Sequence, residues 1–333
     1  MKILVTGGTG FLGSRLISQL VKDGHKVFAL TRSSSSHEKL RALGATSTEG
    51  DLDSGGALSL PLVDAVVHAA ALFRFAGPRA PYFRTNVEGT KALLKAAEKA
   101  GATTFIYISA GGIIMDDKGS PIHNADESAQ SFPNSFSAYL ASKARGEAAV
   151  RAANKPGFRT IALRPSAIWG PGDMFSRELP RAVASGQFAF INRGDYLFAT
   201  SHVDNVIEAV QCALERGAGG HAYFINDKER QTFRGFIAMI ASTKNLKVDK
   251  LRSMPYGLAF TIGRLMEFFA TITFRKGDPP FSRSMVRMIG REFTPSDAAA
   301  RRELGYIGKT SISDGLRLYR NSPSSGAERA SAQ

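Results

Sequence analysis

The fold is decided by residues 2–13, KILVTGGTGFLG, at the start of the chain. Ile3, Leu4 and Val5 form a short apolar run, which predicts a buried parallel strand. A glycine-rich turn follows, and residues 10–13 open an amphipathic helix. Glycines let backbone N–H groups approach a phosphate closely, and a helix start carries about half a positive charge. The stretch therefore predicts a site for the pyrophosphate of a dinucleotide.

The spacing of the glycines separates this turn from the most familiar dinucleotide motif. Gly7, Gly10 and Gly13 follow the pattern G-x-x-G-x-x-G, whereas many dehydrogenases use G-x-G-x-x-G. A glycine turn alone is weak evidence. Its position between a strand and a helix favours dinucleotide binding over an ordinary turn.

The composition is that of a soluble globular protein. With 333 residues, there is room for one large α/β domain and a smaller appendage. Cys212 is the only cysteine, which excludes an internal disulfide and a cysteine-rich metal site, and we predict no metal. The net charge of +14 suits a soluble basic enzyme, an anionic cofactor, an anionic membrane surface or nucleic acid. Because no nucleic-acid-binding motif is present, we predict no nucleic-acid partner. The first apolar run is too short for a signal peptide, so we expect a cytoplasmic protein.

Strands and helices alternate along most of the chain. Strands are predicted at residues 26–30, 64–68, 105–109, 159–163 and 222–225, and helices at 81–100, 135–153, 174–185, 202–216 and 232–242. This alternation predicts an α/β fold with a doubly wound parallel sheet of the Rossmann type. We expect residues 1–170, completed by about 199–226, to bind the cofactor. A smaller C-terminal domain (171–198 and 227–320) would bind substrate, and 321–333 would be a disordered tail.

Arg32 bears on the choice of cofactor. It follows the predicted strand at 26–30, where the adenosine ribose lies in this type of fold. An acidic residue there would bind the free 2′-hydroxyl of NAD, whereas an arginine suits the 2′-phosphate of NADP. The nearest acidic residue along the chain is Glu38. We therefore predict NADP, with NAD as the alternative.

Tyr139 and Lys143 predict the chemistry. They lie four residues apart on the predicted helix at 135–153, and therefore on one face of it. A phenol has a pKa near 10, and a neighbouring ammonium group stabilises the phenolate. Tyr139 is therefore a candidate acid/base for interconverting an alcohol and a ketone at a nicotinamide, and Lys143 would also bind the nicotinamide ribose. His68, at the end of a buried strand, is predicted to be a packed residue.

Seven motifs occur in an order that resembles the extended short-chain dehydrogenase/reductase family, over about residues 1–225. They are TGGTGFLG, Asp51-Leu52, His68-Ala69-Ala70, Asn86-Val87-x-Gly-Thr, Tyr139-x-x-Ser-Lys143, Arg164-Pro165 and His202-Val203-Asp204-Asn205. The resemblance implies that the pyrophosphate is held by Gly7, Gly10, Phe11 and Leu12. It implies that the rest of the cofactor is bordered by Asp51, Leu52, Ala69, Ala70, Ala71 and Pro165. Asn86 would support the active-site helix and a water molecule.

The chain departs from this family at Ala110. The family serine usually occupies the second position of a Ser-Ser or Ser-Thr pair that ends the fifth strand, and here the pair is Ser109-Ala110. Either Ser109 takes the role through a small shift at the following two glycines, or the hydrogen bond to substrate is partly lost. We expect Ser109 to orient the substrate hydroxyl.

Three functions compete on this fold. Sugar-nucleotide epimerases and dehydratases usually carry an arginine where this chain has Phe198. The aromatic loop at 72–75 suits a bulky apolar ligand instead. The ending at 280–306 resembles the 3β-hydroxysteroid dehydrogenase branch, including bacterial sterol dehydrogenase-like members. We expect an NAD(P)-dependent oxidoreductase acting on a secondary alcohol or ketone of a small, bulky, apolar molecule. The alternatives are a nucleoside-diphosphate-sugar epimerase or dehydratase, and a non-catalytic NADP-sensing protein.

The most apolar segment, 253–274, is interrupted by Arg264 and Glu267 and is too short to cross a bilayer. We predict a helix that belongs to the C-terminal domain and covers the substrate cleft. Its apolar face would carry Leu258, Ile262, Leu265 and Phe269. Membrane contact would be peripheral at most. Because the family often forms dimers through a four-helix interface, a homodimer is also open.

Overall fold

A seven-stranded parallel sheet forms the centre of the protein. The computed structural model describes residues 1–272, 279 and 281–321. The strand order is β12-β7-β5-β4-β1-β2-β3, which confirms the predicted doubly wound fold. The strands are β1 (Lys2–Thr6), β2 (Lys26–Thr31), β3 (Thr46–Glu49), β4 (Ala65–His68), β5 (Thr104–Ile108), β7 (Arg159–Pro165) and β12 (His221–Ile225).

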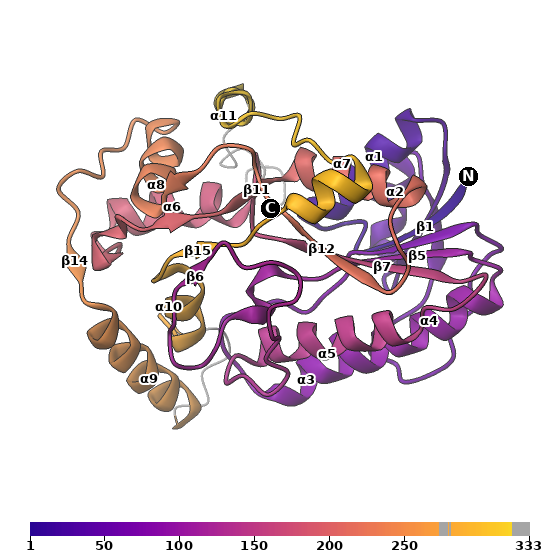
Figure 1. Ribbon diagram of the computed structural model, residues 1–333, viewed down its shortest axis with the longest axis horizontal. Coiled ribbons are helices and arrows are strands. Elements are labelled where there is room, and N and C mark those ends of the chain that lie inside the picture. Colours follow the sequence, from indigo (N-terminus) through magenta and orange to yellow (C-terminus); the bar gives the residue numbers. More distant parts are fainter. Residues whose placement is uncertain (273–278, 280, 322–333) are drawn as a thin grey trace.

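Helices cover both faces of the sheet (Figure 1). One face carries α1 (Phe11–Lys22), α2 (His37–Ala42) and α7 (Val203–Glu215), and the other carries α3 (Arg79–Phe83), α4 (Gly89–Lys99) and α5 (Ala138–Ala152). In β1, Ile3 and Val5 pack against the first set of helices, while Leu4 packs on the opposite side. The strand is apolar on both faces because both are covered.

The helix predicted at 81–100 is interrupted by a π-helical turn. Helix α3 continues directly into a π-helix (Arg84–Glu88) and then into α4. Such insertions are rare and frequently occur at functional sites. Here the turn carries Asn86.

Most of the remaining elements form a second unit beside the carboxyl ends of the central strands, on the left of Figure 1. A four-stranded sheet has the order β13-β10-β15-β6, and two strand pairs, β8 with β11 and β9 with β14, lie beside it. The strands are β6 (Ile122–His123), β8 (Ala167–Trp169), β9 (Phe190–Ile191), β10 (Leu197–Phe198), β11 (Thr200–His202), β13 (Gln231–Thr232), β14 (Ser253–Met254) and β15 (Phe293–Thr294). The helices are α6 (Met174–Ala184), α8 (Phe233–Ser242), α9 (Tyr256–Ile272), α10 (Arg283–Ile289) and α11 (Ile312–Asn321). Strands of two or three residues are too short for a periodicity to predict them.

Helix α9 confirms the helix predicted in the apolar segment, but the predicted apolar face is not the face that packs against the protein. Leu258, Leu265 and Phe269 are exposed, and Ala259 and Gly263 are buried instead. A Cβ atom on Gly263 would lie 2.8 Å from the backbone nitrogen of Arg283. The small-residue face is therefore the one that fits against the chain entering α10.

Two predictions lie partly outside the described residues. The predicted apolar segment ends at residue 274, so its last two residues lie outside the described ones. Of the predicted tail, 321–333, only Asn321 is described, and it ends α11. Among the helices of the described residues, none is long and apolar enough to cross a membrane.

Candidate active site

The glycine turn after β1 carries no side chains at its glycines, so a ligand can contact the backbone N–H groups of the turn directly. Gly7 has a φ of +73°, and a Cβ atom there would lie 2.9 Å from the backbone nitrogen of Ala70. A Cβ on Gly13 would lie 2.1 Å from the Gly7 carbonyl oxygen. Gly10 precedes α1 and provides no side-chain cap, so the first N–H groups of the helix, from Phe11 and Leu12 onward, stay available for a phosphate. The turn therefore fits the pyrophosphate of a dinucleotide.

The ends of β1 and β4 lie side by side at the middle of this site. The Ala70 N–H donates to Thr6 Oγ1 at 3.1 Å, which holds the chain after β4 against the glycine turn. Ala69 and Ala70 are half-buried and Ala71 is exposed. Small residues here let a flat group lie against the backbone.

His68 is a packed residue, as predicted. Its ring shares hydrogen bonds with Thr6 at 2.7 Å and Thr90 at 2.9 Å. Burial, with a smaller contribution from the charge of Lys143, lowers the pKa of His68 to about 3. The imidazole is therefore neutral and structural.

The adenosine end of the site contains a carboxylate that the sequence analysis missed. Arg32 follows β2 and is 71% exposed, with Nη1 3.8 Å from the Asp53 carboxylate. Asp53 also accepts a hydrogen bond from Thr85, and its backbone N–H donates to Asp51 Oδ1 at 3.0 Å. Leu52 lies beside Gly89 at the start of α4. Arg32 therefore has an acidic neighbour from the loop after β3, although Glu38 is nearer in the sequence.

Lys143 is a fully buried cation on α5. Its ammonium group donates to the Ile108 carbonyl at 2.6 Å and lies 4.0 Å from the centroid of the Tyr107 ring. The residue is 2% exposed. Burial lowers the pKa of Lys143 to about 7, and the charge of Glu147 opposes this shift. The site thus holds a lysine that titrates near neutrality.

Tyr139 lies one turn before Lys143 on α5. Burial raises the pKa of its phenol above the ordinary value, so the hydroxyl remains protonated and can donate to a carbonyl oxygen. The Phe73 ring packs edge-on against Tyr139, with centroids 4.7 Å apart. Phe73 is 40% exposed and forms an aromatic wall beside the candidate acid/base.

Asn86 connects the loop after β4 to α5. Its Nδ2 donates to the Leu72 carbonyl at 3.0 Å and to Ser142 Oγ at 2.9 Å, while its Oδ1 accepts from the Leu72 N–H at 2.7 Å. This geometry supports the helix that carries Tyr139 and Lys143. The water expected beside Asn86 stays a prediction.

The loop that carries Phe73 is anchored on both sides. Beyond Leu72, Tyr82 donates to the Ala76 carbonyl at 2.7 Å, and Ser282 donates to the Phe75 carbonyl at 3.2 Å. The Phe73 ring is therefore presented from a fixed backbone. Sequence analysis noted the aromatic residues of this loop but not their contact with Tyr139.

Ser109 belongs to a buried ionic network that the sequence analysis also missed. Its hydroxyl donates to Glu147 Oε2 at 2.7 Å. The Arg164 guanidinium donates to both oxygens of the same carboxylate, with Nη2 to Oε1 at 2.6 Å and Nε to Oε2 at 3.0 Å. The Ser109 hydroxyl thus has a partner within the protein. Its expected role in orienting the substrate hydroxyl stays a prediction. The available signal was the position of Glu147, four residues after Lys143 on the same helix face.

Pro165 is the last residue of β7. A Cβ atom on Gly111 would lie 3.1 Å from the Pro165 carbonyl oxygen. It therefore borders the segment after β5 that includes Ala110.

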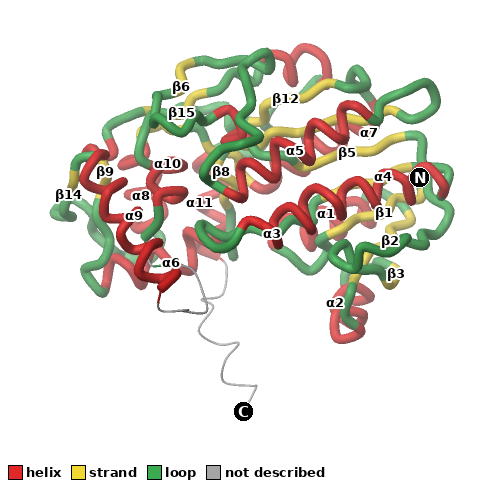
Figure 2. The backbone as a smooth tube through the Cα atoms, turned by 90° about the horizontal axis from the view of Figure 1, so that it is seen from below, coloured by secondary structure: helices red, strands yellow, loops and turns green. Residues whose placement is uncertain are grey.

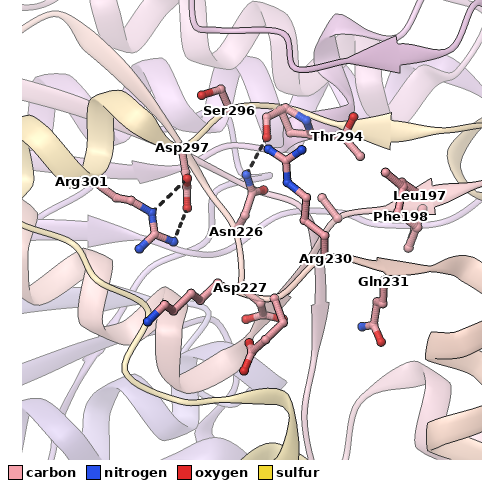
Figure 3. A pocket seen from close by; sticks show the side chains of 14 residues that line it. Leu197, Phe198, Asn226, Asp227, Arg230, Gln231, Thr294, Ser296, Asp297 and Arg301 are labelled. Carbon is pink, nitrogen blue, oxygen red and sulfur yellow. Dashed lines mark hydrogen bonds and ion pairs between the residues drawn. The ribbon is translucent and has the colours of Figure 1, made fainter.

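A separate cavity of about 310 Å³ lies beside β10 and β15 (Figure 3). Arg301 and Asp297 form an ion pair in its wall, at 2.7 Å. Buried Asp227, also in the wall, accepts from Trp169 Nε1 at 2.6 Å and from Thr200 at 2.7 Å. The described residues that line this cavity include none of the predicted catalytic or cofactor-binding residues, so it is distinct from the site on α5.

The fold and the similarity to known dehydrogenases and reductases identify an NAD(P)-dependent oxidoreductase of the extended short-chain dehydrogenase/reductase type, acting on CH–OH groups. Residues 4–256 match the model of the 3-beta hydroxysteroid dehydrogenase/isomerase family. The chain belongs to this family.

Curated relatives match almost the whole chain. A 4-hydroxy-2-methyl-3-oxo-4-farnesyl-3,4-dihydroquinoline-1-oxide ketoreductase of Stigmatella aurantiaca is 36% identical, with 98% of each chain covered. A 3-beta-hydroxysteroid dehydrogenase of Mycolicibacterium neoaurum is 30% identical, covering 92% of this chain and 86% of the relative. A dTDP-glucose 4,6-dehydratase structure from Streptomyces venezuelae superposes with a TM-score of 0.74 at 23% identity, covering 97% of this chain and 98% of that chain. At that identity, the structural match shows the fold alone.

Proposed function

We propose that the enzyme interconverts a secondary alcohol and a ketone on a bulky apolar substrate, and that it prefers NADP to NAD. The observation that carries the substrate class is the partly exposed Phe73 ring, which makes a T-shaped contact with Tyr139 at 4.7 Å between ring centroids. A substrate that reaches the phenol must lie beside an aromatic ring on a fixed loop. Apolar surface of the substrate would be buried there at about 25 cal/mol per Å².

The residues of α5 divide the chemistry between them. Tyr139 exchanges a proton with the substrate oxygen. Lys143 places a positive charge beside that phenol and binds the nicotinamide ribose, and Asn86 holds the helix in place. When bound, the nicotinamide supplies or accepts the hydride. With alanine at 110, we propose that Ser109 supports Glu147 and that Tyr139 makes the main hydrogen bond to the substrate oxygen.

The names of the relatives support a bulky apolar substrate, since one is a ketoreductase for a farnesylated quinoline oxide and another a hydroxysteroid dehydrogenase. The sugar-nucleotide alternative needs a cation to hold a diphosphate. The position where that branch usually carries arginine is Phe198, which is buried in the core with Phe233. Burying a lysine is unfavourable, and a non-catalytic protein would gain nothing from burying Lys143 one helical turn after Tyr139.

Further parts of the proposal concern the whole molecule. We assign substrate binding to residues 171–198 and 227–320, and we expect a cytoplasmic enzyme. A homodimer through a four-helix interface, as the family resemblance implies, is a further proposal, which light scattering tests.

A substrate panel tests the proposed function. Purified enzyme is mixed with NADPH or NADH and with fused-ring ketones, 2-alkyl-3-oxo acids or UDP-sugars, and loss of reduced cofactor is recorded. We expect turnover of ketones and faster reaction with NADPH. Phe73→Ala should lower kcat/KM for fused-ring ketones about tenfold, by removing roughly 1–2 kcal/mol of ring contact. The control Leu62→Ala alters an exposed apolar residue outside the segments assigned to substrate binding and should leave kcat/KM unchanged. Conversion of UDP-sugars with no ketone reduction would contradict the proposal.

A further inference from the structure

Helix α9 has one face that is fully used by the protein. Tyr256, Ala259 and Gly263 are buried and recur every three to four residues, so they form one side of the helix. This side packs against α10. The close approach of Arg283 to Gly263 leaves no room for a side chain between the two segments. The inner face of α9 is therefore complete.

The opposite face of α9 is exposed and apolar. Leu258 and Leu265 are each 52% exposed and Phe268 is 60% exposed. Together with exposed Thr261 and Arg264, they form a stripe along the helix. We call Leu258, Leu265 and Phe268 the outer stripe. A contiguous group of large apolar side chains on a surface marks an interaction site more often than scattered single residues do.

Arg264 adds a positive charge to the outer stripe, and the segment that precedes α9 in the chain is mainly basic. Glu267, the acidic residue of α9, is bound by the first residue of α10 at 2.7 Å. The segment leading into α9 exposes Lys247, Lys250 and Arg252, with Asp249 as the acidic residue among them. An apolar stripe next to basic side chains complements an anionic lipid surface, where each cation contributes about 1 kcal/mol.

We propose that α9 is an interfacial helix that binds the surface of anionic lipid bilayers. The outer stripe would enter the headgroup region while Arg264 pairs with lipid phosphates, and the helix would lie in the membrane plane. Its position allows this, since α9 lies at the periphery in both views of the molecule (Figures 1 and 2). Pairing of two copies through the stripe is less favourable, because a symmetric contact would bring the two Arg264 side chains together.

The same helix connects the membrane face to the site. Phe260, on α9, packs edge-on against Phe136 at 5.6 Å between ring centroids, three residues before Tyr139. Docking would thus bring the aromatic surroundings of the catalytic tyrosine close to the lipid. That consequence rests on the proposed function, whereas the docking itself does not.

Co-sedimentation of the full-length protein with vesicles tests the docking. The vesicles are phosphatidylcholine alone or phosphatidylcholine with phosphatidylglycerol, at low and high salt. We expect binding to the anionic vesicles that weakens with salt. Leu265→Glu and Phe268→Glu should each lower the partition coefficient about tenfold or more. Leu62→Glu is the matched control, since Leu62 is 72% exposed outside α9, and it should bind like the wild type.

The other outcomes are equally definite. Absence of vesicle binding, or equal losses in Leu265→Glu and Leu62→Glu, would overturn the proposal. Concentration-dependent self-association that Leu265→Glu abolishes, without lipid binding, would instead assign the stripe to a second copy of the chain. Cofactor titration of each variant confirms that the fold is intact. Ketone turnover in detergent-free buffer is recorded separately, so failure of docking and failure of the proposed function are distinguishable.

Discussion

Helix α5 buries charged side chains, whereas helix α9 exposes apolar ones. Within α5, Lys143 and Glu147 are almost completely shielded from water. Along α9, Leu265 and Phe268 lie in solvent. Both arrangements oppose the usual distribution of residues between core and surface.

The two departures have different physical consequences. Burying a charge is unfavourable unless partners compensate for the lost water. The neighbouring strands supply these partners, with Ile108 of β5 for Lys143 and Arg164 of β7 for Glu147. Exposing an apolar stripe is unfavourable until something covers it. A compensated buried charge indicates chemistry within the fold, and an uncovered apolar face indicates a partner outside it. The predictions below test this contrast.

The largest expected effect is that of Tyr139→Phe. Removing the hydroxyl removes the proton donor, so kcat should fall by about 10²–10⁴-fold. The affinity for NADP should stay nearly unchanged, because the glycine turn is untouched. Steady-state rates and a fluorescence titration of cofactor measure the two quantities. Unaltered turnover would show that the charges of α5 serve stability alone.

Glu147→Gln tests whether the buried charge of α5 is compensated. The variant leaves Arg164 buried without its carboxylate, so the free energy of unfolding should fall by about 3–5 kcal/mol. The control Glu98→Gln breaks the exposed ion pair with Lys155, which should change stability by about 0–1 kcal/mol. Urea denaturation of both variants gives the comparison. Equal effects would contradict the distinction between buried and exposed charges.

Arg32→Ala tests an exposed charge that we propose binds the cofactor. A charge-assisted contact with the 2′-phosphate is worth about 1.5–3 kcal/mol, so NADP affinity should fall roughly tenfold or more. NAD affinity should not change. Arg41→Ala is the control, since Arg41 is an exposed arginine on α2. Equal NADP binding by wild type and Arg32→Ala would show that Asp53 already neutralises this arginine.

Lys143→Met should change how stability depends on pH. In the folded protein, burial lowers the lysine pKa from 10.5 to about 7. Between these values the unfolded chain binds a proton that the folded chain lacks, so wild-type stability rises with pH in this window. Relative to Lys143→Met, cofactor-free wild type should therefore gain about 2 kcal/mol from pH 7 to pH 9. A constant difference between the two proteins would show that Lys143 stays charged.

The sequence predicted those parts of the site that lie within one segment. The glycine turn, the Tyr139 and Lys143 pair on one helix face, and the packed His68 are local patterns with fixed geometry. The contacts of Asp53 with Arg32 and of Arg164 with Glu147 join segments far apart in the chain. No periodicity reports such pairs, and only the parallel sheet brings them together.

The buried face of α9 could not be predicted for a related reason. Its residues are apolar on most sides, so composition does not distinguish the inner face from the outer one. The choice is made by Gly263, where the chain entering α10 approaches too closely for a side chain. Periodicity predicted the helix, while its orientation depended on a distant segment.

The most direct test of the central claim follows the hydride in a single turnover. Deuterium is placed at the transferable position of NADPH, a fused-ring ketone is added, and the product is analysed by mass spectrometry. Ketone reduction with Tyr139 as proton donor predicts an alcohol that carries one deuterium on the carbinol carbon, and no labelled alcohol from Tyr139→Phe. An unlabelled product, or equal labelling by the wild type and Tyr139→Phe, would contradict the account.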